Sequence, residues 1–390
     1  THLFKCRKTL WYSKREKTKL RILVATPIFM NRLTACLTLR LLPVIGPITA
    51  QKLVHTYGSP EAIFDAEPHP EKVPNERLRK LLEKARSVQK EVASIKEWMK
   101  KEALIPLLWG TEAYPLALAR CPDAPLLLFC RGELDWEGRR WLAVVGTRRP
   151  SAYGEKSCRA LLEAIQPYNP VIVSGLAYGI DAVAHQTALD LKLDTVACLP
   201  HAFGQPIYPA PHQKLSVRIA QQGALVSDFI PTQGFERGHF IQRNRLIAGL
   251  CEATLVIETG EKGGSLITAN FASQYDRELY ALPGPIHSQQ SRGCHALIQS
   301  RQAELIDSVE VLIESLGWAG LQNPKQIRIP LDLSPTGEKL YKRMLHNGKQ
   351  SLDKLAKAEG LSISETAIVL MELEMKKVVR PLPGKYFELR

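Results

Sequence analysis

The sequence predicts an α/β protein built on a doubly wound parallel sheet, with a small helical domain before the sheet and a winged helix after it. Across residues 104–320, short apolar runs alternate with helical segments and glycine-rich turns, which is the pattern of successive βαβ units. Residues 31–103 show only helical periodicity, and residues 335–390 show helical segments followed by a β pair. The polar, proline-containing residues 321–334 are the expected linker.

The helical domain contains a candidate helix-hairpin-helix at residues 42–54. Apolar residues recur in this domain at spacings of three and four, at Leu33, Leu37, Leu41, Leu42, Leu78, Leu81, Leu82, Ile95 and Trp98. The turn of such a hairpin can direct backbone N–H groups at a phosphate, but here Val44 stands where a second glycine is usual. Contact with DNA and a purely structural turn are both open interpretations.

Six apolar runs are the expected strands of the sheet. They are residues 142–145, 171–174, 195–199, 224–226, 254–257 and 278–282. In a parallel sheet the loops at the carboxyl ends of the strands lead into helix N-termini, whose free N–H groups attract anions. We therefore look for a ligand site at that edge.

Composition and charge favour a globular protein with a polyanionic partner. A hydrophobic content of 45% and a charged content of 23% are not those of a disordered chain, and the net charge of +13 suits a nucleic acid. Residues 1–29 hold eight basic residues and one acidic residue, a balance of +7. We expect residues 1–30 to be an extension outside the fold. A secretory signal is disfavoured because the apolar run that follows the basic residues is short and is broken by Arg21 and Pro27.

Several classes of protein are disfavoured by missing patterns. The eight cysteines form no CxxC pair and no histidine lies at metal-ligand spacing, so we expect reduced thiols in the cytoplasm and no metal site. No apolar run approaches the roughly eighteen residues that a membrane helix needs. Neither GxGxxG nor GxxxxGK[ST] is present, so no nucleotide cofactor is expected.

Three small-residue turns are candidates for holding phosphates. The turn in residues 144–154 contains Gly146, Thr147 and Arg148, and the turn in residues 173–181 contains Gly175. The third begins a helix at Gly264 and Ser265. Any βα unit needs a glycine turn, so one such turn alone indicates little; three at one sheet edge favour an anion site.

A helical segment at residues 238–249 adds basic side chains to this edge. Arg243 and Arg245 flank Asn244 there, and we expect them to form a basic rim that faces the anion. The alternative is that one of these arginines pairs with an internal acid such as Asp181 or Glu258.

The ordered motifs of the chain resemble those of the DNA-processing protein A family (DprA/Smf). The matching segments are Gly146-Thr-Arg, residues 174–185 (SGLAYGIDAVAH), Ile207-Tyr-Pro, residues 243–250 (RNRLIAGL), residues 264–269 (GSLITA), Leu282-Pro-Gly and residues 293–298 (GCHALI). The resemblance covers residues 31–390. It implies an extended Rossmann-like domain that binds single-stranded DNA cooperatively, often as a homodimer, and loads the RecA recombinase onto it during natural transformation. Single-strand-binding protein is a further candidate partner.

The resemblance also implies which residues contact DNA. These are Gly146, Thr147 and Arg148, the loop after Tyr208 and Pro209, and the segment from Phe240 to Arg245, with bases stacked on Phe240 or Tyr208. Family members often have a lysine directly after the Tyr-Pro pair, where this chain has Ala210. That contact is either missing or supplied by Lys214 or His212.

Two enzymatic functions are alternatives to DNA binding. The first is hydrolysis, since Ser174, Asp181 and His185 are close in sequence. Ser174 lacks a G-x-S-x-G elbow, however, and an Asp and a His at this spacing are typical of a helix cap and a satisfied histidine. We therefore expect no catalytic residues. A nucleotide-processing enzyme of the lysine-decarboxylase-like group would need a Pro-Gly-Gly-x-Gly-Thr turn, which is absent.

A winged-helix regulator is the remaining alternative, with residues 362–373 as recognition helix. That helix and its end carry Glu365, Glu372 and Glu374, which would repel the phosphates of a duplex. Contact with a protein is favoured over the reading of bases.

Overall fold

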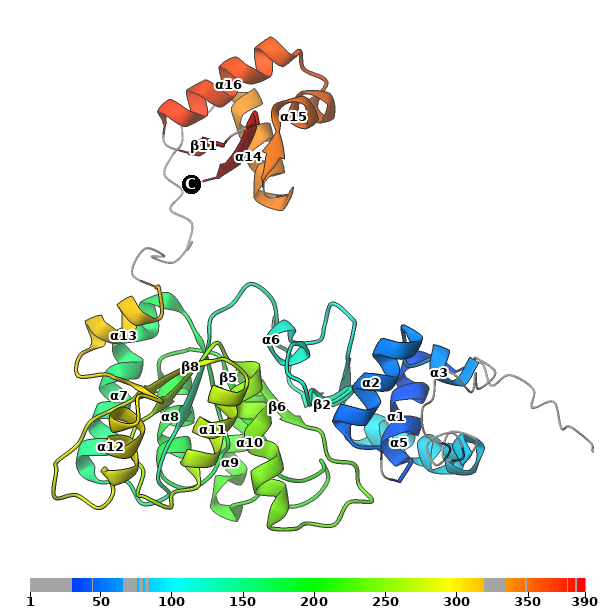
Figure 1. Ribbon diagram of the computed structural model, residues 1–390, viewed down its shortest axis with the longest axis vertical. Helices are drawn as coiled ribbons and strands as arrows, with labels where there is room; N and C mark the ends of the chain where they lie inside the picture. Colours follow the sequence, from blue (N-terminus) through cyan, green and yellow to red (C-terminus); the bar gives the residue numbers. More distant parts are fainter. Residues whose placement is uncertain are drawn as a thin grey trace, which may run out of the picture. The chain divides into compact units, whose positions relative to one another are not determined.

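The computed structural model describes residues 30–43, 45–65, 76, 80, 84–318, 334–347, 349–376, 378–382 and 384–389. The chain divides into two compact units, one that extends to Gln322 and one that begins at Asn323 (Figure 1). Residues 1–29, most of the predicted linker, and Leu78, Leu81 and Leu82 of the helical pattern lie outside the described residues. Met30, which we assigned to the extension, is instead buried against Ala35 and Ala85.

The first unit contains a sheet of nine described strands in the order β1-β2-β6-β5-β4-β3-β7-β8-β9. The strands are β1 Ile105–Leu108, β2 Leu127–Arg131, β3 Trp141–Val145, β4 Val171–Ser174, β5 Thr195–Cys198, β6 Ala224–Ser227, β7 Ala253–Val256, β8 Glu278–Ala281 and β9 Glu304–Leu305. From β6 to β9 the neighbours are parallel, whereas β1 and β2 form an antiparallel edge. All six predicted strands are present, each within about one residue of its expected bounds.

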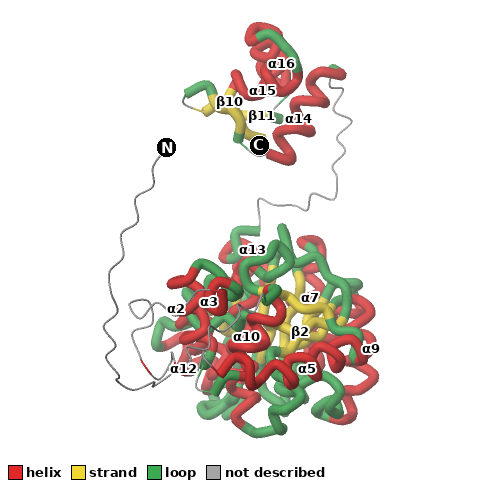
Figure 2. Tube along the Cα trace, turned by 90° about the vertical axis from the view of Figure 1, so that its right-hand side faces the viewer, coloured by secondary structure: helices red, strands yellow, loops and turns green. Residues whose placement is uncertain are grey.

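Helices cover both faces of this sheet, which is why its strands are continuously apolar (Figure 2). The helices are α6 Leu116–Ala119, α7 Ala152–Ile165, α8 Ile180–Asp190, α9 Gln213–Gln222, α10 Gly238–Leu250, α11 Ser265–Gln274, α12 Arg292–Gln299 and α13 Val309–Ser315. In β3, Ala143 and Val145 pack into the hydrophobic cluster of α10 and α11. Leu142 and Val144 pack into the cluster of α7 and α8 on the other face. The doubly wound prediction is therefore confirmed.

The helical segment before the sheet belongs to the same compact unit. Its described elements are α1 Arg32–Leu41, α2 Pro47–Tyr57, α3 Ala62–Asp65, the 3₁₀ turn Lys84–Val88 and α5 Gln89–Lys101. Asn31 caps α1 by accepting the Thr34 N–H, and Pro47 occupies the first turn of α2, where no N–H donor is needed.

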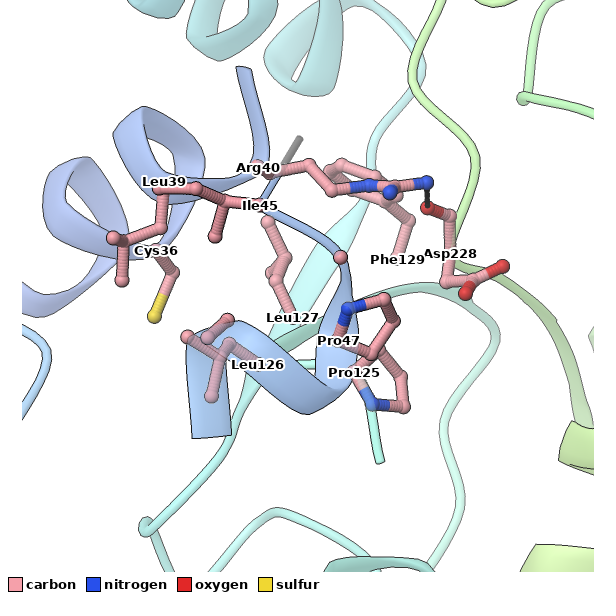
Figure 3. A pocket seen from close by; sticks show the side chains of 12 residues that line it. Cys36, Leu39, Arg40, Ile45, Pro47, Pro125, Leu126, Leu127, Phe129 and Asp228 are labelled. Carbon is pink, nitrogen blue, oxygen red and sulfur yellow. Dashed lines mark hydrogen bonds between the residues drawn. The ribbon is translucent and has the colours of Figure 1, made fainter. Parts of the chain in front are cut away.

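The predicted hairpin turn between α1 and α2 lies against the sheet edge. Figure 3 shows the small apolar cavity, about 30 Å³, that remains between these helices and Leu126, Leu127 and Phe129. Ile45 of the turn is buried, and Arg40 Nη2 donates to the main-chain oxygen of Asp228 at 3.2 Å. This packing favours the structural interpretation of the hairpin.

The second unit is the predicted winged helix. Its elements are α14 Pro335–Asn347, β10 Gln350–Ser351, α15 Leu352–Glu359, α16 Ile363–Met375, β11 Val379–Leu382 and β12 Tyr386–Leu389, with the antiparallel order β10-β12-β11. Its core includes Leu340, Leu355, Leu370, Leu373 and Val379. None of the described helices in either unit is long and apolar enough to cross a membrane.

Candidate nucleic-acid interface

A cleft of about 440 Å³ opens at the carboxyl edge of the parallel strands. It lies beside β3 and β7, where the strand order reverses, which is the usual ligand position in open α/β sheets. Its walls are the turn after β3 and the first turns of α10 and α11. The predicted residues that line it are Gly146, Thr147, Arg148, Phe240, Arg243, Asn244, Gly264 and Ser265.

The turn after β3 is held rigidly by its own chain. A Cβ on Gly146 would come within 2.6 Å of Ile180 Cγ1, so glycine is needed for this close approach. The Thr147 N–H donates to the main-chain oxygen of Glu258 at 2.7 Å, and Thr147 Oγ1 accepts the Arg149 N–H at 3.2 Å. The Thr147 N–H is therefore not available to a phosphate. The Thr147 hydroxyl can still donate its hydrogen to one.

Arg148 is the exposed cation of the cleft. Its guanidinium carbon lies 5.4 Å from the centroid of the Phe240 ring. In the described part of the chain Arg148 has neither a hydrogen bond nor an ion pair through its side chain. It also lines a second, more open depression of about 600 Å³, together with Arg149 and Tyr178. Arg149 is a second exposed cation at this position, and we did not predict it.

Aromatic rings continue the surface from Arg148. Phe240 contacts Tyr208 and Phe235 with centroid separations of 5.3 Å and 5.5 Å, and Tyr208 lies 5.7 Å from Phe235. Tyr208 is 38% exposed and Phe235 is 49% exposed. These three residues, here called the aromatic cluster, are candidates for stacking with unpaired bases. Phe235 was missed in the sequence, although a phenylalanine among the polar residues 231–237 is a usable signal.

The prediction of an exposed basic rim at Arg243 and Arg245 is wrong. Arg243 is 3% exposed, and its guanidinium donates to the main-chain oxygens of Gly175 and of Cys198, the latter at 2.6 Å. Burial lowers the pKa of Arg243, and the nearby Asp181 opposes this shift. Arg243 reaches the cleft wall but serves mainly to join β4, β5 and α10.

Arg245 points away from the cleft. It is 7% exposed and forms ion pairs with Asp228 and, at 3.9 Å, with Asp123. Burial alone would lower the pKa of Arg245, but these two carboxylates raise it. Arg245 therefore pairs with internal acids, as in the alternative interpretation. The acids are Asp228 and Asp123, and not Asp181 or Glu258.

The turn after β4 is occupied by the chain's own carboxylate. Asp181 Oδ2 accepts the N–H groups of Gly175 and Ala177 at 3.2 Å and 3.3 Å. A Cβ on Gly175 would lie 2.5 Å from the Arg243 guanidinium, so Gly175 makes room for that side chain. The expected phosphate cradle at this turn is therefore not free.

The turn before α11 keeps two amides for a ligand. The Ser265 hydroxyl donates to Thr259 Oγ1 at 2.7 Å, which fixes the start of the helix. Among the described residues, no acceptor takes the N–H groups of Gly264 and Ser265. Asn244 Nδ2 donates to the Gly264 oxygen at 3.5 Å and so links the walls of α10 and α11.

Neither replacement for the lysine missing after Pro209 lines the cleft. Lys214 is exposed on α9, outside the cleft wall. His212 Nδ1 is 2.9 Å from the Leu176 oxygen, and its ring packs against Tyr178. The exposed positive charge at the cleft thus comes from Arg148, with Arg149 beside it.

The residues of the hydrolase alternative do not form a triad: the Ser174 side chain interacts with Asp181, but His185 hydrogen-bonds to neither of them. Ser174 is buried and donates to the Val144 oxygen at 2.6 Å. His185 is buried, with Nδ1 2.7 Å from Thr195 Oγ1, while Asp181 faces Gly175 and Ala177. No group of three or more histidine, cysteine or acidic residues in the described ranges could hold a metal ion.

Comparisons with known proteins agree with this architecture. Residues 106–317 match the family model of DNA recombination-mediator protein A, and residues 328–385 match the DprA winged helix domain. The chain is 34% identical to protein Smf of Escherichia coli, over 74% of this chain and 77% of that protein. It is 37% identical to the DNA processing protein DprA of Bacillus subtilis, over 55% of this chain and 71% of that protein.

A solved structure extends the comparison to the fold. The crystal structure of DNA processing protein A from Streptococcus pneumoniae is 28% identical and covers 74% of this chain and 98% of its own, with a TM-score of 0.63. The family model spans more than half of this chain. The chain therefore belongs to the DNA recombination-mediator protein A family, also called DprA or Smf.

Proposed function

We propose that this protein binds single-stranded DNA without sequence preference through the cleft beside β3 and β7, and that it is not an enzyme. The observation that supports this most is the position of Arg148, an exposed cation with no internal acidic partner among the described residues, which lies over Phe240 at the mouth of the cleft. A phosphate that meets Arg148 displaces no internal ion pair. Binding of the phosphate therefore carries no free-energy cost for breaking an ion pair of Arg148.

The surfaces around Arg148 indicate where the phosphates and the bases of a strand would lie. Phosphates contact Arg148, Arg149 and the amides of Gly264 and Ser265, and bases stack on the aromatic cluster. A duplex hides its base faces, so it gains the phosphate contacts but not the stacking. We therefore expect the cleft to prefer an unpaired strand.

Fluorescence anisotropy with one labelled oligonucleotide, single-stranded or annealed to its complement, tests this assignment. We expect tighter binding of the single strand and a loss of about 1–3 kcal/mol in Arg148→Ala, the scale of a charged hydrogen bond and its electrostatic field. Arg120→Ala is the matched control, because Arg120 is an exposed arginine that lines no described cleft. Equal losses in the two variants would refute the site.

We also propose the partner reaction that the family resemblance implies: the DNA-bound protein acts as a homodimer and loads RecA recombinase onto the strand during DNA uptake and recombination. Membership of the DNA recombination-mediator family supports this proposal. ATP hydrolysis by RecA on an oligonucleotide coated with single-strand-binding protein measures loading. Wild-type protein should shorten the lag, and Arg148→Ala should not. A lag that wild-type protein leaves unchanged would refute the loading role.

A further inference from the structure

The winged helix has an apolar stripe on the outer face of α16. Ile368, Met371 and Met375 are 69%, 64% and 79% exposed, although they are large and apolar. Thr366, Leu370 and Leu373, on the opposite side of the helix, are buried. In Figures 1 and 2 the other elements of this unit lie on one side of α16. The exposed fractions show that the stripe is not covered within the described part of the unit.

The geometry of the stripe fits another helix. Ile368, Met371 and Met375 follow one another at spacings of three and four, the narrow seam of a two-helix contact. Met side chains are flexible and adapt to such a partner. Contact with a matching apolar seam would remove this stripe from water, which is favourable in free energy.

The charges beside the stripe disfavour a nucleic acid. Glu365 and Glu372 lie on one side of it and Glu374 lies on the other. Glu365 is held at the start of α16 by the capping box with Ser362. Phosphates would meet carboxylates at this face, which disfavours DNA as the molecule that covers the stripe.

We propose that a second copy of this chain covers the stripe, with the two α16 helices antiparallel about an axis near Met371. Glu365 and Lys376 are eleven residues apart, about three helical turns, and therefore lie on the same side of the stripe. In an antiparallel pair, Glu365 of each copy comes beside Lys376 of the other. Lys376 Nζ already lies 2.8 Å from Glu372 Oε1, which offsets the negative charge of Glu372 near the axis.

The size of the stripe determines when this contact forms. One short helix pair covers much less than the roughly 800 Å² per partner of a stable interface, so the contact is weak between free molecules. Copies that bind one DNA strand are held at a high effective concentration, which raises the occupancy of a weak contact. In this respect the inference rests on the proposed function: α16 connects neighbouring copies on the same strand.

Cysteine cross-linking of the full chain tests the arrangement. The cysteines among the described residues are all buried, so Met371→Cys in a Cys6→Ser background introduces an exposed thiol at the proposed axis. Under mild oxidation we expect a disulfide-linked dimer, formed roughly tenfold or more faster when a long oligonucleotide is present. Ser364→Cys is the matched control, because in an antiparallel pair its copies lie at opposite ends.

The outcomes separate this inference from the proposed function. Anisotropy is measured on the same preparations. If both variants bind the oligonucleotide but Met371→Cys links no faster than Ser364→Cys, the antiparallel contact is refuted while DNA binding stands. If DNA binding itself fails, linking at high protein concentration without DNA still tests the contact, and equal rates for the two variants refute it. Adding Ile368→Glu to Met371→Cys should abolish the rapid linking, because it buries a charge in the seam.

Discussion

The guanidinium carbon of Arg148 lies 5.4 Å from the centroid of the Phe240 ring. Arg148 comes from the turn after β3 and Phe240 from the first turn of α10, so two elements that are distant in the sequence meet at the cleft mouth. A cation over an aromatic face at an exposed site contributes about 0.5–1 kcal/mol. That is enough to favour one position of the side chain, yet weak enough to be exchanged for a phosphate.

Phe240→Leu should weaken binding of single-stranded DNA by about 1–3 kcal/mol, because a stacking face for a base is lost while the apolar volume is largely kept. Binding of duplex DNA should change less. Anisotropy with both forms measures the difference, and Phe271→Leu on α11, outside the cleft, is the control. A loss of equal size for both DNA forms would argue against base stacking.

Arg245→Ala should destabilise the fold rather than impair the interface directly. It leaves the buried Asp228 carboxylate without its cation, which costs about 3–5 kcal/mol. Urea unfolding should show a lower midpoint for Arg245→Ala and an almost unchanged midpoint for Arg148→Ala. Near-native stability of Arg245→Ala would show that the Asp228 pair is not structural.

Gly175→Ala should reduce stability through the side chain of Arg243. The added Cβ would stand 2.5 Å from the Arg243 guanidinium, so the arginine must leave the main-chain oxygens of Gly175 and Cys198. We expect a destabilisation of about 1–3 kcal/mol, as for other overpacked sites. Gly264→Ala, where an added Cβ meets nothing within 4 Å, is the control in the same thermal unfolding assay. Equal melting temperatures would contradict this packing.

Acid should destabilise the protein partly through His185. Burial lowers its pKa to about 3, whereas an unfolded histidine titrates near 6.5. Between these values only the unfolded chain takes up this proton, so the free energy of unfolding falls as the pH falls from 6.5 towards 3, by at most about 1.4 kcal/mol per pH unit.

His185→Gln keeps a polar partner for Thr195 Oγ1 but cannot titrate. The difference in unfolding free energy between this variant and the wild type should therefore move in favour of the variant as the pH is lowered from 7 to 5. Urea unfolding at a series of pH values measures it. A difference that is independent of pH would mean that the pKa of His185 is the same in the folded and unfolded protein, and would contradict the lowered pKa.

The sheet was predictable from the sequence, but its antiparallel edge was not. The six strands were recognisable because helices bury both of their faces, which requires uninterrupted apolar runs. β1 contains Pro106 and β9 has only two residues, so neither gives such a run. β2 is apolar, but its antiparallel pairing with β1 and β6 depends on the tertiary fold.

The cleft was predictable at its glycine turns, whereas the role of the arginines was not. Arg148 was identified because it follows a strand directly. Arg243 and Arg245 appear equally exposed in a helical segment, but their partners Gly175, Cys198 and Asp228 lie 68, 45 and 17 residues away. Which side chains turn inward was therefore decided by tertiary contacts that one sequence does not reveal.

The salt dependence of single-strand binding tests the central claim most directly. If about four phosphates are neutralised, the slope of log affinity against log salt should be near −3, and Arg148→Ala should reduce its magnitude by about 0.7. The loss of affinity should be the same for every base sequence, since phosphates carry no sequence information. An Arg148→Ala variant with the wild-type slope and affinity at low salt would contradict the account.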